Sequence, residues 1–248
     1  MRRLLINFTG MSKAVVLVIA CLAAFGGRAQ ETIIRDPNAQ PRAVKGYHGI
    51  RVSDAIDLYL TQGQEEAVVV SAKDVKIRDR IVTEVVNGIL VIRLDAKLWH
   101  HLRDNKMKAY VSFTILDEIT GSGGSDIYVD GVIAGEKLSM NFSGASDFKG
   151  AIRVGRLDLE QSGASHSLIT GLVTGPAKMR FSGASDLKGY ELAVDECSVN
   201  ASGSSDVRIT VNKQLDVDAS GASSIYYKGE GIVRESHSSG ASSVSHKG

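Results

Sequence analysis

The chain has 248 residues, and its 29 basic and 28 acidic side chains leave a formal net charge of +1. This near-neutral balance, with no block of like charges, argues against nucleic-acid binding and against a charged disordered tail. Only two cysteines are present, which excludes a disulfide-rich scaffold.

Residues 1–29 have the features of an export signal. A basic start is followed by an apolar run at residues 14–25, too short to span a membrane comfortably, and small residues precede Gln30. We therefore expect cleavage after Ala29. The product is then a secreted protein, in the periplasm, on the outer-membrane surface or outside the cell, with no membrane span after cleavage.

A lipoprotein signal is the alternative interpretation of the same segment. Residues 18–21 have the shape of a lipidation motif that ends in Cys21, and a lipid on this cysteine would anchor the protein in a membrane. The apolar run continues past Cys21 through residues 22–25, which favours ordinary cleavage.

The next segments contain turn-forming residues and short apolar runs. Residues 30–45 hold Pro37 and Pro41 and few apolar side chains, so they are predicted to form a linker. Residues 46–120 are interpreted as an irregular N-terminal β cap, in which Asn87-Gly88 predicts a type I′ hairpin. The expected strands are residues 49–52, 56–60, 68–71, 81–86, 89–94 and 109–115, with one helical turn at 75–80.

A short phrase, Ser-Gly-Ala-Ser-Asp, recurs through the second half of the chain. Its complete or variant copies lie 18 to 21 residues apart, and a fixed period near twenty is typical of a solenoid. We predict an all-β fold in which residues 121–248 form a parallel β-helix of seven Ser-Gly-x-Ser coils, with about 20 residues per coil. The copies begin at Ser122, Ser143, Ser162, Ser182, Ser202, Ser220 and Ser239.

Apolar and polar residues alternate on both sides of each phrase, as in strands with one buried face. Positions five and three before the first Ser, and five after it, are mostly apolar. The copy at Ser162 has Ser167 at the last of these positions and Leu168 one residue later, so we expect a one-residue irregularity there. Stacked coils would bury these side chains in a continuous core.

The glycine of each phrase is predicted to form a structural corner, because tight corners need a positive φ that glycine tolerates. Each serine hydroxyl can then bond a corner amide or the serine of the next coil. The predicted corner glycines are Gly123, Gly144, Gly163, Gly183, Gly203, Gly221 and Gly240.

These features together resemble one known family. The segments Gly49–Val52, Ile56–Gly63 and Val85–Ile92, followed by the Ser-Gly phrases, resemble the putative auto-transporter adhesin, head GIN domain family of secreted proteins from Gram-negative bacteria. The resemblance covers residues 46–248. It implies a right-handed parallel β-helix and a cell-envelope or extracellular role, and it brings no established catalytic residue. The later copies depart from the pattern, since Ser224 and Ser243 replace Asp.

The fifth phrase position suggests a row of carboxylates. Stacked carboxylates repel one another, so either a cation such as calcium or neighbouring hydrogen-bond donors must compensate them. His166 interrupts the row, which leaves too few ligands for a tight calcium site, and Asp beside Gly usually caps its own turn. We therefore favour capping over calcium for Asp126, Asp147, Asp186 and Asp206.

Two other groups of residues could carry chemistry. His100 and His101 with Asp104 could bind a transition metal, but neighbouring His side chains diverge on a strand, and a solvated loop is the simpler interpretation. Cys197 occupies a predicted inward position and is expected to be a buried thiol. We expect no metal and no cofactor.

The most direct functional interpretation is a non-catalytic adhesin or surface-binding module. Its flat polar face would engage a glycan or another envelope component. A polysaccharide-cleaving enzyme is one alternative, but such enzymes need a localised acid–base cluster and aromatic subsites, whereas the repeats have few aromatics and dispersed charges. A purely structural envelope protein is the other alternative.

Overall fold

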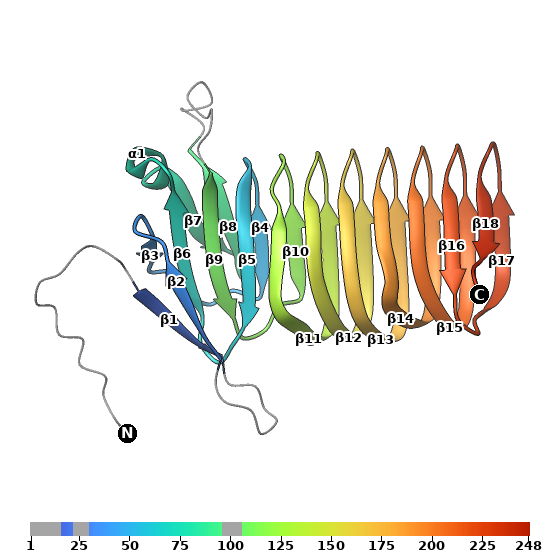
Figure 1. Ribbon diagram of the computed structural model, residues 1–248, viewed down its shortest axis with the longest axis horizontal. Coiled ribbons are helices and arrows are strands. Elements are labelled where there is room, and N and C mark those ends of the chain that lie inside the picture. The colour runs from blue at the N-terminus through green and yellow to red at the C-terminus, as the bar shows by residue number, and fades with distance from the viewer. Residues whose placement is uncertain (1–15, 22–29, 96–105) are drawn as a thin grey trace, which may run out of the picture.

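The computed structural model describes residues 16–21, 30–95 and 106–248, with side chains from residue 36 onward. The structure is 67% strand and 2% helix, and parallel strands stack into a long solenoid of about 6 turns (Figure 1). The predicted all-β solenoid with coils of about 20 residues is confirmed.

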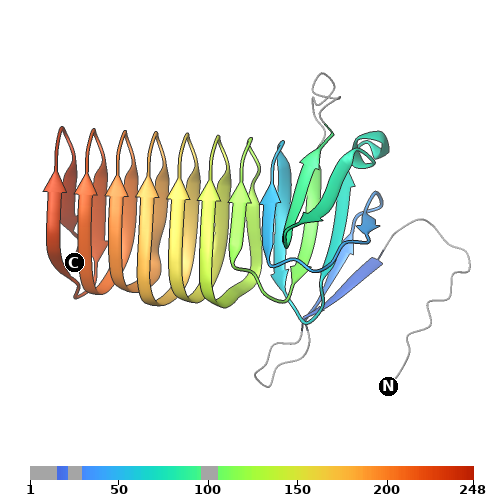
Figure 2. The ribbon, with the colours of Figure 1, turned by 180° about the vertical axis from the view of Figure 1, so that it is seen from behind.

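The solenoid is built from strands that bend around the coil and pair in parallel with the next one. Seven Ser-Gly corners separate these strands, and the C-terminal strands lie at the end opposite the N-terminal segment (Figure 2). The strands are β10 (Glu118–Gly121), β11 (Ile127–Phe142), β12 (Asp147–Gln161), β13 (His166–Phe181), β14 (Asp186–Ala201), β15 (Asp206–Ala219), β16 (Ser224–Lys228), β17 (Ile232–Ser238) and β18 (Ser243–His246).

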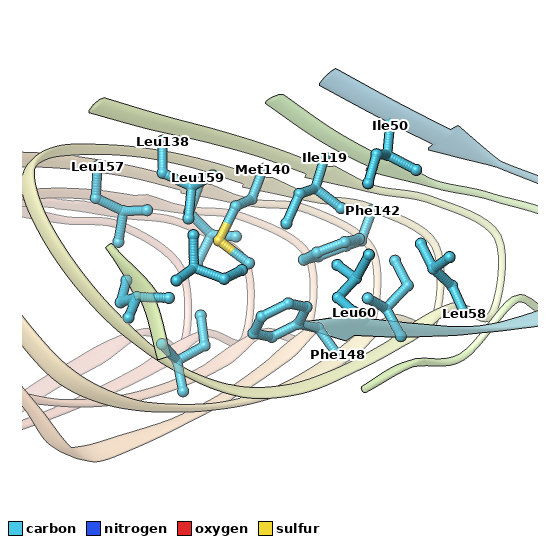
Figure 3. Close-up of a cluster of buried hydrophobic side chains, with 14 of the residues drawn as sticks. Ile50, Leu58, Leu60, Ile119, Leu138, Met140, Phe142, Phe148, Leu157 and Leu159 are labelled. Atoms are coloured by element: carbon cyan, nitrogen blue, oxygen red, sulfur yellow. The ribbon is translucent and has the colours of Figure 1, made fainter. Parts of the chain in front are cut away.

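The core is a set of inward columns, because residues at the same coil position pair directly. Leu138 pairs with Leu157 and Met140 with Leu159, and all four side chains are buried in the interior (Figure 3). Burying a side chain of this size stabilises the fold by roughly 1.5–3 kcal/mol. No coil can bury these side chains alone, so stability comes from stacking.

The one-residue irregularity expected in the coil that begins at Ser162 is present but lies beyond Ser167, since the pairing of β13 with β14 shifts by one residue between Leu168 and Gly171. Ser167 pairs with Phe148 on one side and Leu187 on the other, so it stays in the inward column and is buried. Leu168 points outward and is 40% exposed. Hydrogen bonding between neighbouring strands holds the register, since a one-residue slip would turn every following side chain to the wrong face.

Two strand pairs of the expected N-terminal cap continue the stacking of the solenoid. The first is β4 (Gly49–Val52) with β5 (Ile56–Gln62), and these strands pair in parallel with β10 and β11. The second is β8 (Ile89–Leu94) with β9 (Met107–Phe113), which pair in parallel with β4 and β5. The order in space is therefore β8, β4, β10, which differs from the order along the chain.

Antiparallel strands cover this end of the molecule. The strand β7 (Ile81–Val86) pairs with β8 through the predicted hairpin, where Asn87 and Gly88 have φ of 52° and 78°. On the other side of the coil, β6 (Ala67–Ala72) pairs with β9, and β3 (Gln40–Arg42) pairs with β6. Part of the expected linker thus belongs to the sheet. The short helix α1 (Val75–Arg78) follows β6.

The start of the chain contributes one separate element. The strands β1 (Val16–Cys21) and β2 (Gln30–Arg35) form an antiparallel pair of their own. Most of the expected export signal, including the cleavage position after Ala29, lies outside the described residues. In the part of the chain that is described, no helix has the length and apolar character needed to cross a membrane.

The last described coil differs from the others. Ser236 and Ser238 pair with the buried Val217 and Ala219, so serine replaces the apolar residues of the preceding coil. Both serines are exposed. This coil therefore covers the apolar core of the preceding one with a mixture of serine and valine side chains.

Candidate functional site

Each corner divides its coil into two outward surfaces. We call the surface formed by residues two and four positions before the first Ser the pre-corner face, and the surface formed by residues four and six positions after it the post-corner face. Because strands in a sheet lie about 4.8 Å apart, equivalent residues of successive coils form straight rows on both faces.

The corner glycines form a closely stacked column. Their φ angles lie between 66° and 77°, in the left-handed region. A Cβ atom added to Gly183 would lie 2.5 Å from the carbonyl oxygen of Gly163, and one added to Gly203 would lie 2.5 Å from that of Gly183. Glycine is needed here both for its backbone conformation and for the close approach of the neighbouring corner.

The second serine of the first six phrases is buried and turns inward. Ser185 Oγ donates a hydrogen bond of 2.6 Å to the carbonyl oxygen of Ser182 in the same corner, and Ser205 bonds Ser202 in the same way at 2.9 Å. This carbonyl acceptor was not among the expected partners. The hydroxyl of Ser146 does accept from the amide of Ser125 on the next coil, at 3.3 Å. The buried serines thus brace the corners from inside.

The row of aspartates lies on the post-corner face, and its members have separate partners. The hydroxyl of Tyr128 donates to Asp126 at 3.3 Å. A single guanidinium, that of Arg208, lies 3.1 Å from Asp186 and 3.6 Å from Asp206.

Asp147 bonds the neighbouring coil instead of its own corner. Its Oδ1 accepts from the backbone amide of His166 and lies 3.2 Å from the His166 ring nitrogen. Corner amides elsewhere bond the preceding coil, as Asp186 N does to Ser165 O at 3.1 Å and Ala184 N to Gly163 O at 2.7 Å. The expectation that each Asp caps its own corner therefore differs from the observed bonds, because the stacked backbone already satisfies these amides.

The other candidates from the sequence give no built site. Among the described residues, no three His, Cys, Asp or Glu side chains come together in a way that would hold a metal ion. His100, His101 and Asp104 lie outside the described part of the chain. Cys197 is a buried free thiol, and burial raises the pKa of this thiol to about 12, so it is unreactive at neutral pH.

The pre-corner face carries a polar network over three coils. Asn141 Nδ2 donates to Glu160 at 3.2 Å, and Arg180 donates to the other oxygen of the same carboxylate at 3.1 Å. These side chains border an open hollow of about 290 Å³, together with the first serines of three corners, Ser162, Ser182 and Ser202. The surface offers amide, carboxylate and guanidinium groups side by side.

The post-corner face has a ladder of three tyrosines where the N-terminal segment meets the solenoid. The ring of Tyr59 stacks on Tyr110 at 5.1 Å and on Tyr128 at 5.2 Å between ring centroids. Asp57 and Asp126 stand two residues before Tyr59 and Tyr128. Burial, and then the nearby Asp126, raise the pKa of Asp57. The ladder is therefore an aromatic strip bordered by carboxylates.

A family model described as putative auto-transporter adhesin, head GIN domain, matches residues 46–231, which is more than half of the chain. The chain belongs to this family. The matched range includes the N-terminal strand pairs, the tyrosine ladder and six of the seven corners, so the head GIN domain comprises both the solenoid and its covered end.

Solved structures share this fold. A putative adhesin from Bacteroides fragilis is 18% identical with a TM-score of 0.74, and the alignment covers 84% of this chain and 96% of that one. A putative adhesin from Parabacteroides distasonis is 16% identical with a TM-score of 0.67, over 84% and 96%. A putative lipid binding protein from the same organism is 18% identical with a TM-score of 0.64, over 85% and 97%. At these identities the likeness concerns the fold alone. No curated protein matches the sequence.

Sequence reasoning missed the tyrosine ladder of the head GIN domain. Its strands are far apart in the chain and out of order in space, so Tyr59, Tyr110 and Tyr128 gave no periodic signal. A usable signal did exist. Asp57-Leu58-Tyr59 and Asp126-Ile127-Tyr128 share one pattern, and the two segments pair in register.

Proposed function

We propose that this protein is a non-catalytic, secreted or cell-envelope adhesin module of a bacterium, which binds glycan through the flat outer faces of its solenoid. Membership of the adhesin family supports a surface role. The observation that carries the proposal is the arrangement of outward polar side chains in straight, in-register rows beside open hollows, because a linear polymer can contact equivalent groups on several successive coils.

The chemistry of these rows suits saccharide hydroxyl groups. The Glu160 carboxylate accepts hydrogen bonds, the Arg180 guanidinium donates them, and amides such as Asn141 and Asn200 do both. All four side chains are exposed at the pre-corner face. A repeated set of weak contacts gains strength by multivalency when the ligand is itself a repeat.

Several features favour binding over polysaccharide cleavage. Glycoside hydrolysis needs a pair of carboxyl groups on either side of the scissile bond, one of them with a raised pKa. Within residues 36–95 and 106–248, Asp57 is the one carboxyl group whose pKa is raised. Its neighbour Asp126 holds the equivalent position on the adjacent coil, in the same row of the same surface, so the two carboxylates do not face each other across a bound chain.

A glycan array probed with the purified protein tests the proposal. We expect saturable binding to a subset of polysaccharides, with no shortening of the bound chains on prolonged incubation. Released oligosaccharides would instead indicate an enzyme. The absence of binding to every saccharide would favour a purely structural envelope protein.

A further inference from the structure

The C-terminal half of the post-corner face contains a hollow that the glycan proposal leaves unassigned. Its volume is about 390 Å³, and it is lined by Leu168, Lys188, Tyr190, Glu191 and Arg208. Leu168 is the notable member, because it occupies a row whose neighbouring positions are Lys149 and Lys188, and its side chain is 40% exposed. The floor of the hollow is thus apolar and aromatic, and its rim is charged.

Not every cation around the hollow is paired with a carboxylate. Arg208 is held by two carboxylates, Asp186 and Asp206. The ammonium groups of Lys188, Lys228 and Lys247, by contrast, have no carboxylate within ion-pair distance in the described part of the chain.

Two of these lysines contact aromatic rings instead of carboxylates. The Nζ atom of Lys228 lies 5.0 Å from the centroid of the Tyr190 ring, and that of Lys247 lies 5.0 Å from the centroid of the Tyr226 ring. A cation over a ring keeps its full charge. Two lysines without a carboxylate partner among the described residues, Lys188 in the lining and Lys228 over the ring of Tyr190, therefore lie beside the apolar floor.

We propose that this hollow is a subsite for an anionic saccharide, a sugar that carries a carboxylate or a sulfate group. The inference rests on the proposed function and names the ligand class and its place. The C–H face of the sugar lies against Leu168 and Tyr190, and the anionic group meets Lys188 and Lys228. The anionic group of the ligand pairs with lysines that no protein carboxylate neutralises. The apolar floor favours a sugar over a free ion, because only the sugar has a C–H face to place against it.

Glu191 makes the prediction more specific, because this residue lines the hollow and its charge is opposite to that of the lysines. A carboxylate repels the anionic group of the ligand, and it accepts hydrogen bonds from sugar hydroxyls. Removing the charges of Lys188 and Glu191 should consequently change the affinity in opposite directions. If the two residues had only a structural role, the two substitutions would not change the affinity in opposite directions.

The test is equilibrium binding of the purified full chain to immobilised polygalacturonate, heparin and dextran, which are carboxylated, sulfated and uncharged polymers. We expect binding to a charged polymer and none to dextran. Lys188→Gln should weaken this binding about tenfold, the value for loss of one charge-assisted contact. Glu191→Gln should strengthen it several-fold, and the charged polymer bound by the wild type identifies the anion.

The matched control is Lys76→Gln, which removes the same charge from helix α1, where Lys76 is exposed and belongs to neither outward face of the solenoid. Its affinity should stay near that of the wild type. Tyr190→Ala tests the floor, and it should weaken polymer binding without changing competition by inorganic sulfate. Circular dichroism spectra and melting temperatures of all variants establish that they fold.

The outcomes separate this inference from the proposed function. Equal losses for Lys188→Gln and Lys76→Gln, or binding to dextran alone, would overturn the anionic subsite while leaving a glycan-binding module. Polymer binding that is as strong in Tyr190→Ala as in the wild type would also overturn it, because the site would then take an anion only. Failure to bind any saccharide on a broad array would overturn both.

Discussion

At the residue scale, the repeat phrase allows the backbone of one corner to stack directly on the backbone of the preceding corner. The corner glycine holds a positive φ and lies against the carbonyl of the preceding corner, and the buried serine closes the same corner from inside. The sequence alone predicted the glycine role, because a glycine that recurs at one turn position is typical of a positive φ. It did not predict the partners of Asp147, because these depend on which coil supplies the nearest donor.

Gly183→Val should destabilise the protein strongly, because the added side chain meets the Gly163 oxygen and the residue must hold φ of 73°. Gly124→Val is the control, since Gly124 has φ of 81° but no atom within 4 Å of an added Cβ. The control should lose roughly 1–2 kcal/mol from backbone strain alone, and Gly183→Val clearly more. Urea denaturation measures both, and equal losses would contradict the stacked column.

Ser167→Leu should stabilise the protein. The Ser167 hydroxyl is buried without a hydrogen-bond partner, in a column whose neighbours are Phe148 and Leu187. An unsatisfied buried hydroxyl costs about 1–3 kcal/mol, and leucine adds apolar burial. Thermal denaturation should show a higher Tm, whereas Ser185→Ala, which removes a satisfied hydroxyl, should show a lower one. A decrease for Ser167→Leu would mean that the column has no room for it.

At the element scale, the order of the coils in space could not be predicted from the sequence. The strand bounds 49–52, 81–86 and 89–94 were predicted as observed, because each follows from local alternation. The coil made by β4 and β5 was not recognised, since its corner has no glycine. Asp54 and Ala55 take φ of 66° and 56° there, and the Asp54 carboxylate accepts from Leu94 N at 2.9 Å. Its partner strand β10 lies far along the chain.

The tyrosine ladder joins these elements and should make stability depend on alkaline pH. Burial, and then nearby carboxylates and Tyr59, raise the pKa of Tyr110 from 10.0 to about 12. Between these pH values the phenol of Tyr110 loses its proton in the unfolded chain before it does so in the folded one. The contribution of Tyr110 to the free energy of unfolding is therefore complete below pH 10 and disappears as the pH rises towards 12. Tyr110→Phe keeps the ring and should flatten the fall of Tm between pH 10 and 12. An unchanged slope would show that Tyr110 titrates as an exposed phenol.

At the scale of the whole molecule, the fold is an elongated stack with one covered end and two long faces on which outward side chains of varying type form rows (Figure 1). The periodic core was readable from the sequence because every coil repeats it. The faces were not, since outward residues vary freely from coil to coil. The residues at variable positions, such as Leu168 and Tyr190, therefore determine what the protein binds, whereas the residues at repeated positions determine its fold.

Isothermal titration calorimetry of the purified protein with a polysaccharide selected on the array tests the central claim most directly. A non-catalytic surface-binding module should give a saturable isotherm, with the heat returning to baseline after each injection and the polymer recovered at its original length. Heat that continues after saturation together with shortened polymer, or no saturable heat with any saccharide, would contradict it.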